Sequence, residues 1–120
     1  MDPKTEGRKM RALAATPEWS VGSVQAVTQD GHLLIASASG SQIPAHVQGA
    51  DHVLFVVGVQ KIVKNIDEGV RRIFEQVLPL ENTRALKAYG QPSAVNSLLV
   101  MNAQTPGRVT ILLLKEEIGF

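Results

Sequence analysis

The chain has 120 residues, the size of one domain, and 44% of them are hydrophobic, which is enough to build a packed core. It contains no cysteine, so disulfides, thiolate zinc sites and cysteine-ligated iron–sulfur clusters are excluded. Twelve basic and eleven acidic side chains give a formal net charge of +1, too little to supply the affinity of phosphate-backbone binding. We therefore expect no nucleic-acid partner.

The first 18 residues mix acidic and basic side chains with proline and glycine, a composition typical of a mobile segment. We expect a flexible arm over residues 1–18, with at most a short helix at Met10–Ala15, and a domain over residues 19–120. The arm lacks the apolar run of a secretory signal, and the longest apolar run of the chain, Val53–Val57, is too short to span a membrane. The expectation is a cytoplasmic protein without a membrane partner.

Two strand-like runs, Ser23–Thr28 and His32–Ser37, flank the dipeptide Asp30-Gly31. Asp-Gly between two such runs predicts an antiparallel hairpin, because glycine adopts the positive φ that the turn requires. A helical spacing of apolar residues follows over Gln42–Gln48, and Ser41 is placed to cap the start of this short helix.

The run His52–Gly58 is rich in β-branched and aromatic residues without alternation, which predicts a central strand covered on both faces. Asn65, with Glu68 three residues later, indicates a capping box that starts a helix over Ile66–Leu78. We expect Glu68 and Arg72 to face solvent as an i, i+4 pair, as Asp67 and Arg71 do. The predicted apolar face consists of Ile66, Val70, Ile73, Phe74, Val77 and Leu78.

Pro79 predicts a kink and the start of a second helix, which Gly90 would end. Two further strands are expected at Asn96–Ala103 and Arg108–Lys115, joined as a second hairpin by a type II turn over residues 104–107. The predicted fold class is α/β, with a mixed sheet flanked by helices.

Two segments of the sequence are candidates for binding an anion. The loop of small residues after the first hairpin precedes a helix N-terminus, where the backbone of Ser39, Gly40 and Ser41 offers N–H groups, although an ordinary small-residue turn has the same composition. Gly58 and Lys61 lie at and just after the carboxyl end of the predicted central strand, and ligands of open α/β sheets gather beyond these ends. Lys61 could bind a phosphate or carboxylate, act as a nucleophile if desolvated, or be a solvated surface lysine.

Asn82 and Arg84 on the second helix are further candidates, since a guanidinium fork binds a carboxylate bidentately. The alternative for Arg84 is a surface ion pair with Glu81 or Glu117.

No cofactor is predicted, and no residue is assigned as a nucleophile or general base, so whether the protein is an enzyme stays open. A Gly-x-Ser-x-Gly elbow is absent from the sequence. We expect structural roles, and no metal site, for the three histidines, whose spacing fits no metal motif: His32, His46 and His52.

Four co-linear elements in the second half of the chain carry a family resemblance. They are Gly58-Val59-Gln60-Lys61-Ile62-Val63, the helix Gly69-Val70-Arg71-Arg72-Ile73, the set Pro79, Asn82 and Arg84, and the terminal Ile118-Gly119-Phe120. The chain resembles the LUD (lactate-utilisation) domain family, whose members carry a Gly-x-x-Lys-Ile-Val element, an Ala/Gly-x-x-Arg-Ile helix, a similar Pro, Asn and Arg stretch and a terminal Leu-Gly-Phe.

The resemblance implies an α/β fold similar to the ribose-phosphate isomerase and CoA-transferase type, and a role linked to the oxidation of lactate to pyruvate. Domains of this family are longer upstream, so the chain looks like an N-terminally truncated, C-terminal portion of one. The missing strands would leave an edge or a face that another chain covers, and we therefore expect a homo-oligomer or a partner subunit. The cysteine cluster of some members is absent here, so iron–sulfur binding is not carried over.

The leading interpretation is a LUD-type domain that binds a small anionic metabolite through the backbone of Ser39–Ser41 and through Lys61, with Asn82 and Arg84 as further contacts. A second interpretation, from another class, is a noncatalytic assembly or regulatory subunit, a truncated paralogue. A third, by fold analogy alone, is a sugar-phosphate isomerase or a CoA-transferase-like enzyme.

Overall fold

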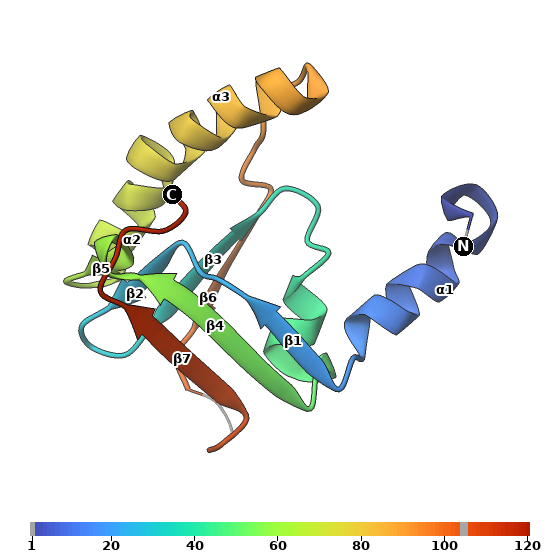
Figure 1. Cartoon of the computed structure of the whole chain (residues 1–120), viewed down its shortest axis with the longest axis horizontal. Helices are drawn as coiled ribbons and strands as arrows, with labels where there is room; N and C mark the ends of the chain where they lie inside the picture. The colour runs from blue at the N-terminus through green and yellow to red at the C-terminus, as the bar shows by residue number, and fades with distance from the viewer. Residues whose placement is uncertain (1, 104–105) are drawn as a thin grey trace.

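The computed structural model describes residues 2–103 and 106–120, and within these ranges the strands form two sheets (Figure 1). The parallel sheet has the order β1-β4-β7, with β1 at Trp19–Gly22, β4 at His52–Gly58 and β7 at Val109–Leu114. The mixed sheet has the order β5-β2-β3-β6, with β5 at Ile62–Val63, β2 at Ala26–Thr28, β3 at Leu33–Ser37 and β6 at Ser97–Met101. The helices are α1 (Pro3–Ala15), η1 (Ala45–Gly49), η2 (Val59–Lys61), α2 (Ile66–Arg72), η3 (Ile73–Val77) and α3 (Leu78–Tyr89).

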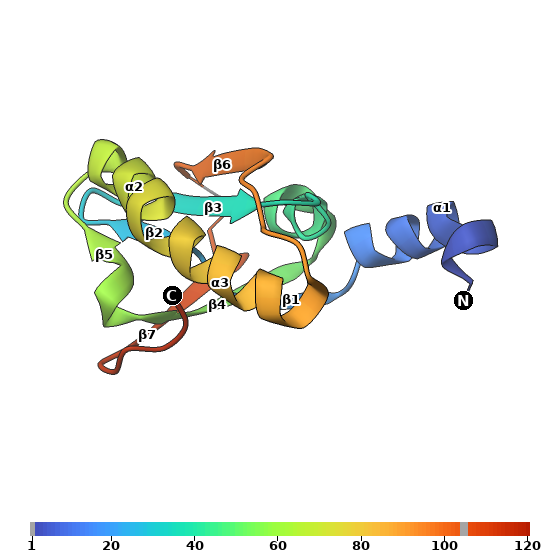
Figure 2. The ribbon, with the colours of Figure 1, turned by 90° about the horizontal axis from the view of Figure 1, so that it is seen from above.

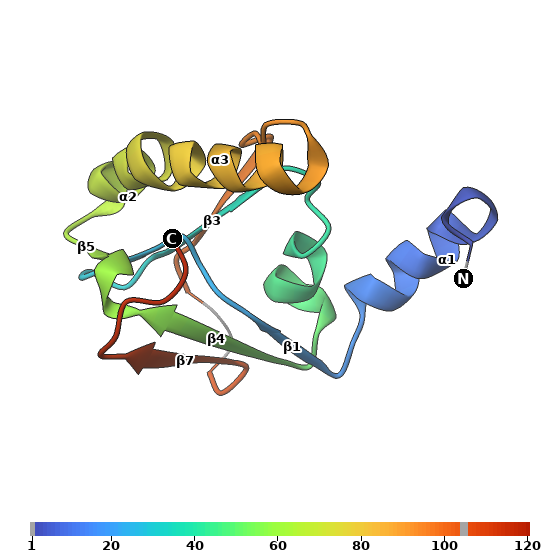
Figure 3. The same ribbon diagram turned by 45° about the horizontal axis from the view of Figure 1, so that its top comes forward.

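The two sheets and the helices α2 to α3 make three layers (Figure 3). The first core lies between the sheets, where Val53, Phe55 and Val57 of β4 join Leu33 and Ile35 of β3. The second core lies on the other face of the mixed sheet, beneath the helices, and its fully buried members are Ala26, Leu34 and Ile73. The mixed sheet is thus covered on both faces, and the structure is α/β with parallel and antiparallel strands, as predicted.

The first hairpin and the central strand are confirmed. β2 and β3 pair antiparallel, and Gly31 in the turn has φ of +96°. β4 lies between β1 and β7, both parallel to it. Burial along β4 alternates, however, because Val53, Phe55 and Val57 are fully buried while Leu54 and Val56 between them are half-buried. The expectation that β4 is covered on both faces is therefore wrong for the face that points away from the mixed sheet.

The long helical segment begins as predicted, with the side chain of Asn65 accepting a hydrogen bond from the Glu68 N–H at 3.0 Å. The Glu68 carboxylate reaches back and accepts from the Lys64 N–H at 3.0 Å, one residue before the usual capping-box position. The helical segment is not interrupted at Pro79, because the π-helical turn η3 leads directly into α3, whose second residue is Pro79. A proline ring collides with the carbonyl four residues earlier in a regular helix, and a wider turn before Pro79 relieves that collision.

Two residues of α2 and η3 differ from the prediction. Phe74, expected on the apolar face, is 47% exposed. Arg72, expected to pair with Glu68 in solvent, is buried at 8% exposure. Main-chain oxygens from distant segments surround the guanidinium of Arg72, and sequence spacing contains no sign of them.

The second predicted hairpin is wrong. β6 pairs antiparallel with β3 in the mixed sheet, whereas β7 pairs parallel with β4 in the other sheet. Each strand finds its hydrogen bonds with a partner far away in sequence, so the local turn signal did not determine the pairing. Of the predicted turn, Gln104 and Thr105 lie outside the described residues, and Gly107 has φ of +83°.

The N-terminal segment contains more regular structure than predicted. Helix α1 is capped by the Asp2 side chain, which accepts from the Lys4 N–H at 2.9 Å, and it projects away from the body of the molecule (Figure 2). The helix ends where it meets η1, and a Cβ on Gly49 would lie 1.6 Å from the Ala15 carbonyl oxygen. The strand β1 after it was not predicted, and the mobility expected for residues 1–18 stays a prediction. No helix in the described part of the chain is both long enough and apolar enough to cross a membrane.

The short helix after the first hairpin is the π-helical turn η1, and Ser41 does not cap it. The Ser41 hydroxyl instead accepts from the Ser39 hydroxyl at 3.0 Å. The guanidinium of Arg108 donates to the carbonyls of Ala45 and His46 in η1 and of Ala50 just after it, at 2.9 to 3.0 Å. Arg108 therefore ties η1 to the start of β7.

Candidate functional site

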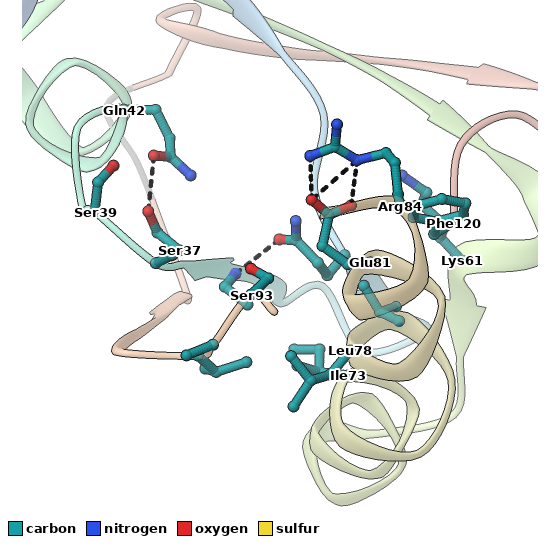
Figure 4. Close-up of a pocket in the computed structure, with 16 residues that line it drawn as sticks. Ser37, Ser39, Gln42, Lys61, Ile73, Leu78, Glu81, Arg84, Ser93 and Phe120 are labelled. Atoms are coloured by element: carbon teal, nitrogen blue, oxygen red, sulfur yellow. Dashed lines mark hydrogen bonds and ion pairs between the residues drawn. The ribbon is translucent and has the colours of Figure 1, made fainter. Parts of the chain in front are cut away.

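A cavity of about 480 Å³ lies between the helices η3 and α3, the end of β3 and the segment that reaches Phe120 (Figure 4). Its volume falls in the range of small-molecule sites. Ser37, Ser39 and Gln42 stand on one side of it and Lys61, Arg84 and Phe120 on the other (Figure 4). Ile73, Val77 and Leu78 contribute an apolar helical wall.

Lys61 is a buried cation in the cavity wall. The 3₁₀ turn η2 directs its side chain inward, so that the residue is only 7% exposed. The ammonium donates to the Ser23 hydroxyl at 3.2 Å, and among the described residues no carboxylate forms an ion pair with it. Burial lowers the pKa of Lys61, and the positive charge of Arg72 lowers this pKa further. The interpretation of Lys61 as a solvated lysine is therefore wrong.

Arg72 is a second buried cation close to Lys61. Its guanidinium donates to the carbonyl oxygens of Gln25 at 2.8 Å and Gln60 at 3.4 Å, and to the main-chain oxygen of Phe120. Burial lowers the pKa of Arg72. Because three segments hold this guanidinium, its charge is fixed in place beside the cavity.

The segment leading to Phe120 crosses directly over Gly58. A Cβ on Gly58 would lie 2.8 Å from the Ile118 nitrogen and 2.9 Å from the Glu116 oxygen, so only glycine allows this approach. The Gln60 side chain donates to the Ile118 carbonyl at 2.6 Å and fixes the crossing. Gly58 thus serves the site indirectly, by letting the chain place Phe120 at the cavity.

Arg84 reaches the cavity from α3 as half of an ion pair. Its Nε donates to both carboxylate oxygens of Glu81, at 2.9 and 3.0 Å, and its Nη2 donates to one of them. These hydrogen bonds lower the pKa of Glu81 and raise the pKa of Arg84, to which Tyr89 also contributes. The alternative of an ion pair with Glu81 is therefore confirmed, and any anion at Arg84 would compete with that carboxylate.

The loop of small residues satisfies its own backbone. The Gly40 N–H donates to the Ser37 hydroxyl at 2.8 Å, and the Ser41 N–H donates to the Ser39 hydroxyl at 3.3 Å. The Ser37 hydroxyl itself donates to the Gln42 side chain at 2.9 Å. In this conformation the backbone N–H groups of Gly40 and Ser41 are already hydrogen-bonded and do not point freely into the cavity. Ser37, Ser39 and Gln42 line the cavity here with hydroxyl and amide side chains.

The sequence matches the family model of the LUD domain over residues 2–114. The chain belongs to the LUD domain family. LUD stands for lactate utilisation, so membership supports a domain related to lactate utilisation. No curated protein and no solved structure matches the chain.

In this LUD domain, the cavity brings together three of the seven residues proposed from sequence, namely Ser39, Lys61 and Arg84. The other four do not line it: Gly40, Ser41, Gly58 and Asn82. The side-chain oxygen of Asn82 is buried without a hydrogen-bond partner in the structure.

Several lining residues of the LUD domain were missed by sequence reasoning. The position of Glu81 could be found from sequence, because Glu81 lies three residues before Arg84 on the same helix and such residues are neighbours. The sequence pattern predicts Glu81 only as a surface partner of Arg84. No local sequence pattern indicates Gln25 and Phe120, because they reach the cavity from distant segments of the chain. No group of three or more His, Asp or Glu side chains that could hold a metal occurs among the residues described.

Proposed function

We propose that this LUD domain binds a small anionic metabolite in the cavity, with a carboxylate or phosphate group between Lys61 and Arg84, and that it serves lactate utilisation or related metabolism. The observation that carries the proposal is the state of Lys61, a cation 7% exposed whose one hydrogen-bond partner in the described structure is the Ser23 hydroxyl. A buried charge without a counter-charge is costly, and a bound anion offsets that cost.

The remaining groups fit the rest of such a ligand. Arg84 can exchange its Glu81 partner for the anion, since the ion pair lies at the solvent-accessible side of α3. The hydroxyls of Ser37 and Ser39, across the cavity, suit a ligand with hydroxyl or carbonyl groups. A three-carbon hydroxy acid would fill only part of a cavity of about 480 Å³, so larger metabolites belong among the ligands tested.

Thermal denaturation with lactate, pyruvate, sugar phosphates, CoA and nucleotides tests this proposal. A ligand at a hundred times its dissociation constant stabilises the folded protein by about 2.7 kcal/mol, which a melting curve resolves. Lys61→Met removes the charge while keeping most of the side-chain volume, and should abolish the stabilisation. Lys64→Met, at an exposed lysine outside the cavity, is the matched control and should keep it. The proposal is wrong if no anion stabilises the protein, or if Lys61→Met binds as tightly as the unchanged chain.

A second candidate function, an assembly subunit, is favoured by the outer face of the parallel sheet. Trp19, Val21 and Leu112 on that face are 55%, 66% and 49% exposed. The register aligns Val21 with Leu54, and Val56 with Leu112, so these side chains form one apolar surface, the outer sheet face. Parallel sheets are almost always covered on both faces. We propose that a second copy of the chain covers this one.

The outer sheet face is too small to form a stable dimer contact by itself. Three strands about 4.8 Å apart and roughly six residues long present a face of roughly 300 Å². A stable dimer buries about 800 Å² on each partner, so the contact would extend to the projecting helix α1, where Leu13 is 57% exposed.

The assembly proposal predicts a dimer, and light scattering after gel filtration measures this oligomeric state. Val21→Lys should convert a dimer to a monomer, whereas Leu80→Lys, at a residue 50% exposed on α3, should leave the dimer intact. A monomer at all concentrations, or a dimer that survives Val21→Lys, would contradict the assembly proposal.

A further inference from the structure

We propose that Lys61 forms an imine with a carbonyl compound that carries a carboxylate or phosphate group, a 2-oxo acid being the simplest such ligand. This inference rests on the proposed function, since the cavity has to accept the anionic group first. It goes further because it assigns Lys61 a covalent role, in which its amine attacks the ligand as a nucleophile.

The surroundings of Lys61 destabilise its ammonium form, so a larger fraction of Lys61 than of an exposed lysine is the neutral amine. Lys61 is 7% exposed, and no described carboxylate pairs with it. The guanidinium of Arg72 beside it cannot turn away, because three main-chain oxygens hold it. Burial and this fixed positive charge both lower the pKa of Lys61. A desolvated lysine next to a second cation is the environment in which lysine amines act as nucleophiles toward carbonyl groups.

The same side of the cavity supplies a place for the anionic part of the ligand. Arg84 stands with Lys61 and Phe120 on that side (Figure 4). The proposal requires that, with the carboxylate or phosphate at Arg84, the neighbouring carbonyl carbon of the ligand faces Lys61. The Ser23 hydroxyl accepts the hydrogen bond from Nζ and so holds the amine in place, and the side chain of Phe120 contributes to the wall beside it.

The reaction balances without a further reactant. The Nζ lone pair forms a bond to the carbonyl carbon, and the carbonyl π electrons move to the oxygen, which takes up a proton from the attacking nitrogen. In the resulting carbinolamine the C–O bond then breaks, and the oxygen leaves as water with the second nitrogen proton. The product is the imine between Nζ and the former carbonyl carbon, and no group is oxidised or reduced.

Reductive trapping tests the imine. The complete chain is incubated at neutral pH with pyruvate or 2-oxoglutarate and sodium cyanoborohydride, digested, and analysed by mass spectrometry. Lys61 should gain the mass of the ligand less one oxygen atom. The exposed lysines Lys4, Lys9, Lys64, Lys87 and Lys115 are internal controls. Labelling of Lys61 should be faster than that of Lys64, because a lowered pKa leaves more of the amine unprotonated at neutral pH.

Three comparisons separate this inference from ordinary lysine chemistry. Acetone, a carbonyl compound without an anionic group, should label Lys61 much less than pyruvate. Arg84→Met should reduce labelling by pyruvate and leave labelling by acetone unchanged. Arg72→Met should move the pH profile of labelling at Lys61 to higher pH, which a merely structural role of Arg72 would not do.

The outcomes distinguish this inference from the proposed function. Lys61→Arg keeps the positive charge but cannot be trapped, and calorimetry measures whether it still binds the anion. If pyruvate or another anion binds and Lys61 is labelled no faster than Lys64, the imine is refuted and anion binding stands. If no anion binds to the unchanged chain or to Lys61→Arg, both proposals are lost.

Discussion

Replacing Phe55 and Phe74 by alanine, one at a time, tests the layer arrangement with one chemical change at two positions. Phe55 is fully buried between the two sheets, where its ring meets the ring of His46 edge-on at a centroid distance of 4.9 Å. Phe74 is 47% exposed on the helical layer, although its spacing predicts a place on the buried face. The two substitutions should therefore differ strongly in cost.

The expected magnitudes follow from burial. A fully buried phenylalanine removes roughly 150 to 250 Å² from water, and its replacement by alanine costs about 4 kcal/mol once the cavity is included. Phe74 buries about half as much, solvent fills the space it leaves, and alanine is the better helix former. We expect Phe74→Ala to cost about 1 kcal/mol or less.

Urea denaturation followed by far-UV circular dichroism measures both costs, since Trp19 is 55% exposed and its fluorescence would report poorly on unfolding. With an m-value of about 2 kcal/mol/M, Phe55→Ala should lower the midpoint by about 2 M and Phe74→Ala by about 0.5 M or less. If Phe55→Ala does not fold, Phe55→Leu should show a smaller loss of the same sign. Equal losses at the two positions would refute the assignment of Phe55 to the core between the sheets.

Two further predictions concern the junction of α1 and the buried histidine. Gly49→Ala should cost about 1 to 3 kcal/mol in thermal denaturation, because the added Cβ meets the Ala15 carbonyl oxygen at 1.6 Å; an unchanged melting temperature would mean that α1 does not contact η1. Burial, and then the charge of Arg108, lower the pKa of His46, so the unfolded chain binds the proton more readily than the folded protein. The free energy of unfolding should therefore fall as pH decreases from about 6.5 toward the folded-state pKa, and this fall should weaken in His46→Gln. A pH profile identical in the two proteins would contradict it.

Elements with a strong local signal were predictable. The Asp-Gly turn predicts the β2–β3 hairpin, the apolar run at His52–Gly58 predicts β4, and the Asn65 cap predicts the start of α2. All three are present in the structure. What local sequence cannot contain is the identity of a strand's partner. The sequence pattern predicts β6 and β7 as strands, but their partners β3 and β4 precede them by many residues. The turn motif between β6 and β7 therefore predicts a hairpin that does not form.

In the candidate site, too, local sequence predicts some residues, and distant segments determine others. Lys61 was identified because it follows the carboxyl end of β4, a position that the local pattern determines. The prediction for Arg72 is wrong because its spacing from Glu68 indicates a solvated pair, whereas its partners Gln25 and Phe120 come from segments that only the folded chain brings together. The strand β1 was missed because it is short and its residues are half-exposed or exposed.

The position of β7 in the chain has a consequence for the order of folding. β4 has two neighbours in its sheet, and the second, Val109–Leu114, is synthesised about fifty residues after it. Until β7 emerges from the ribosome, one edge of β4 has no partner for its main-chain groups. Because β4 and β7 are far apart in sequence, their pairing forms late. Until it forms, the free edge of β4 can pair with other chains. Folding of this domain should accordingly be completed after synthesis of its last strand, which makes a ribosome-bound chain lacking β7 the species most prone to aggregate.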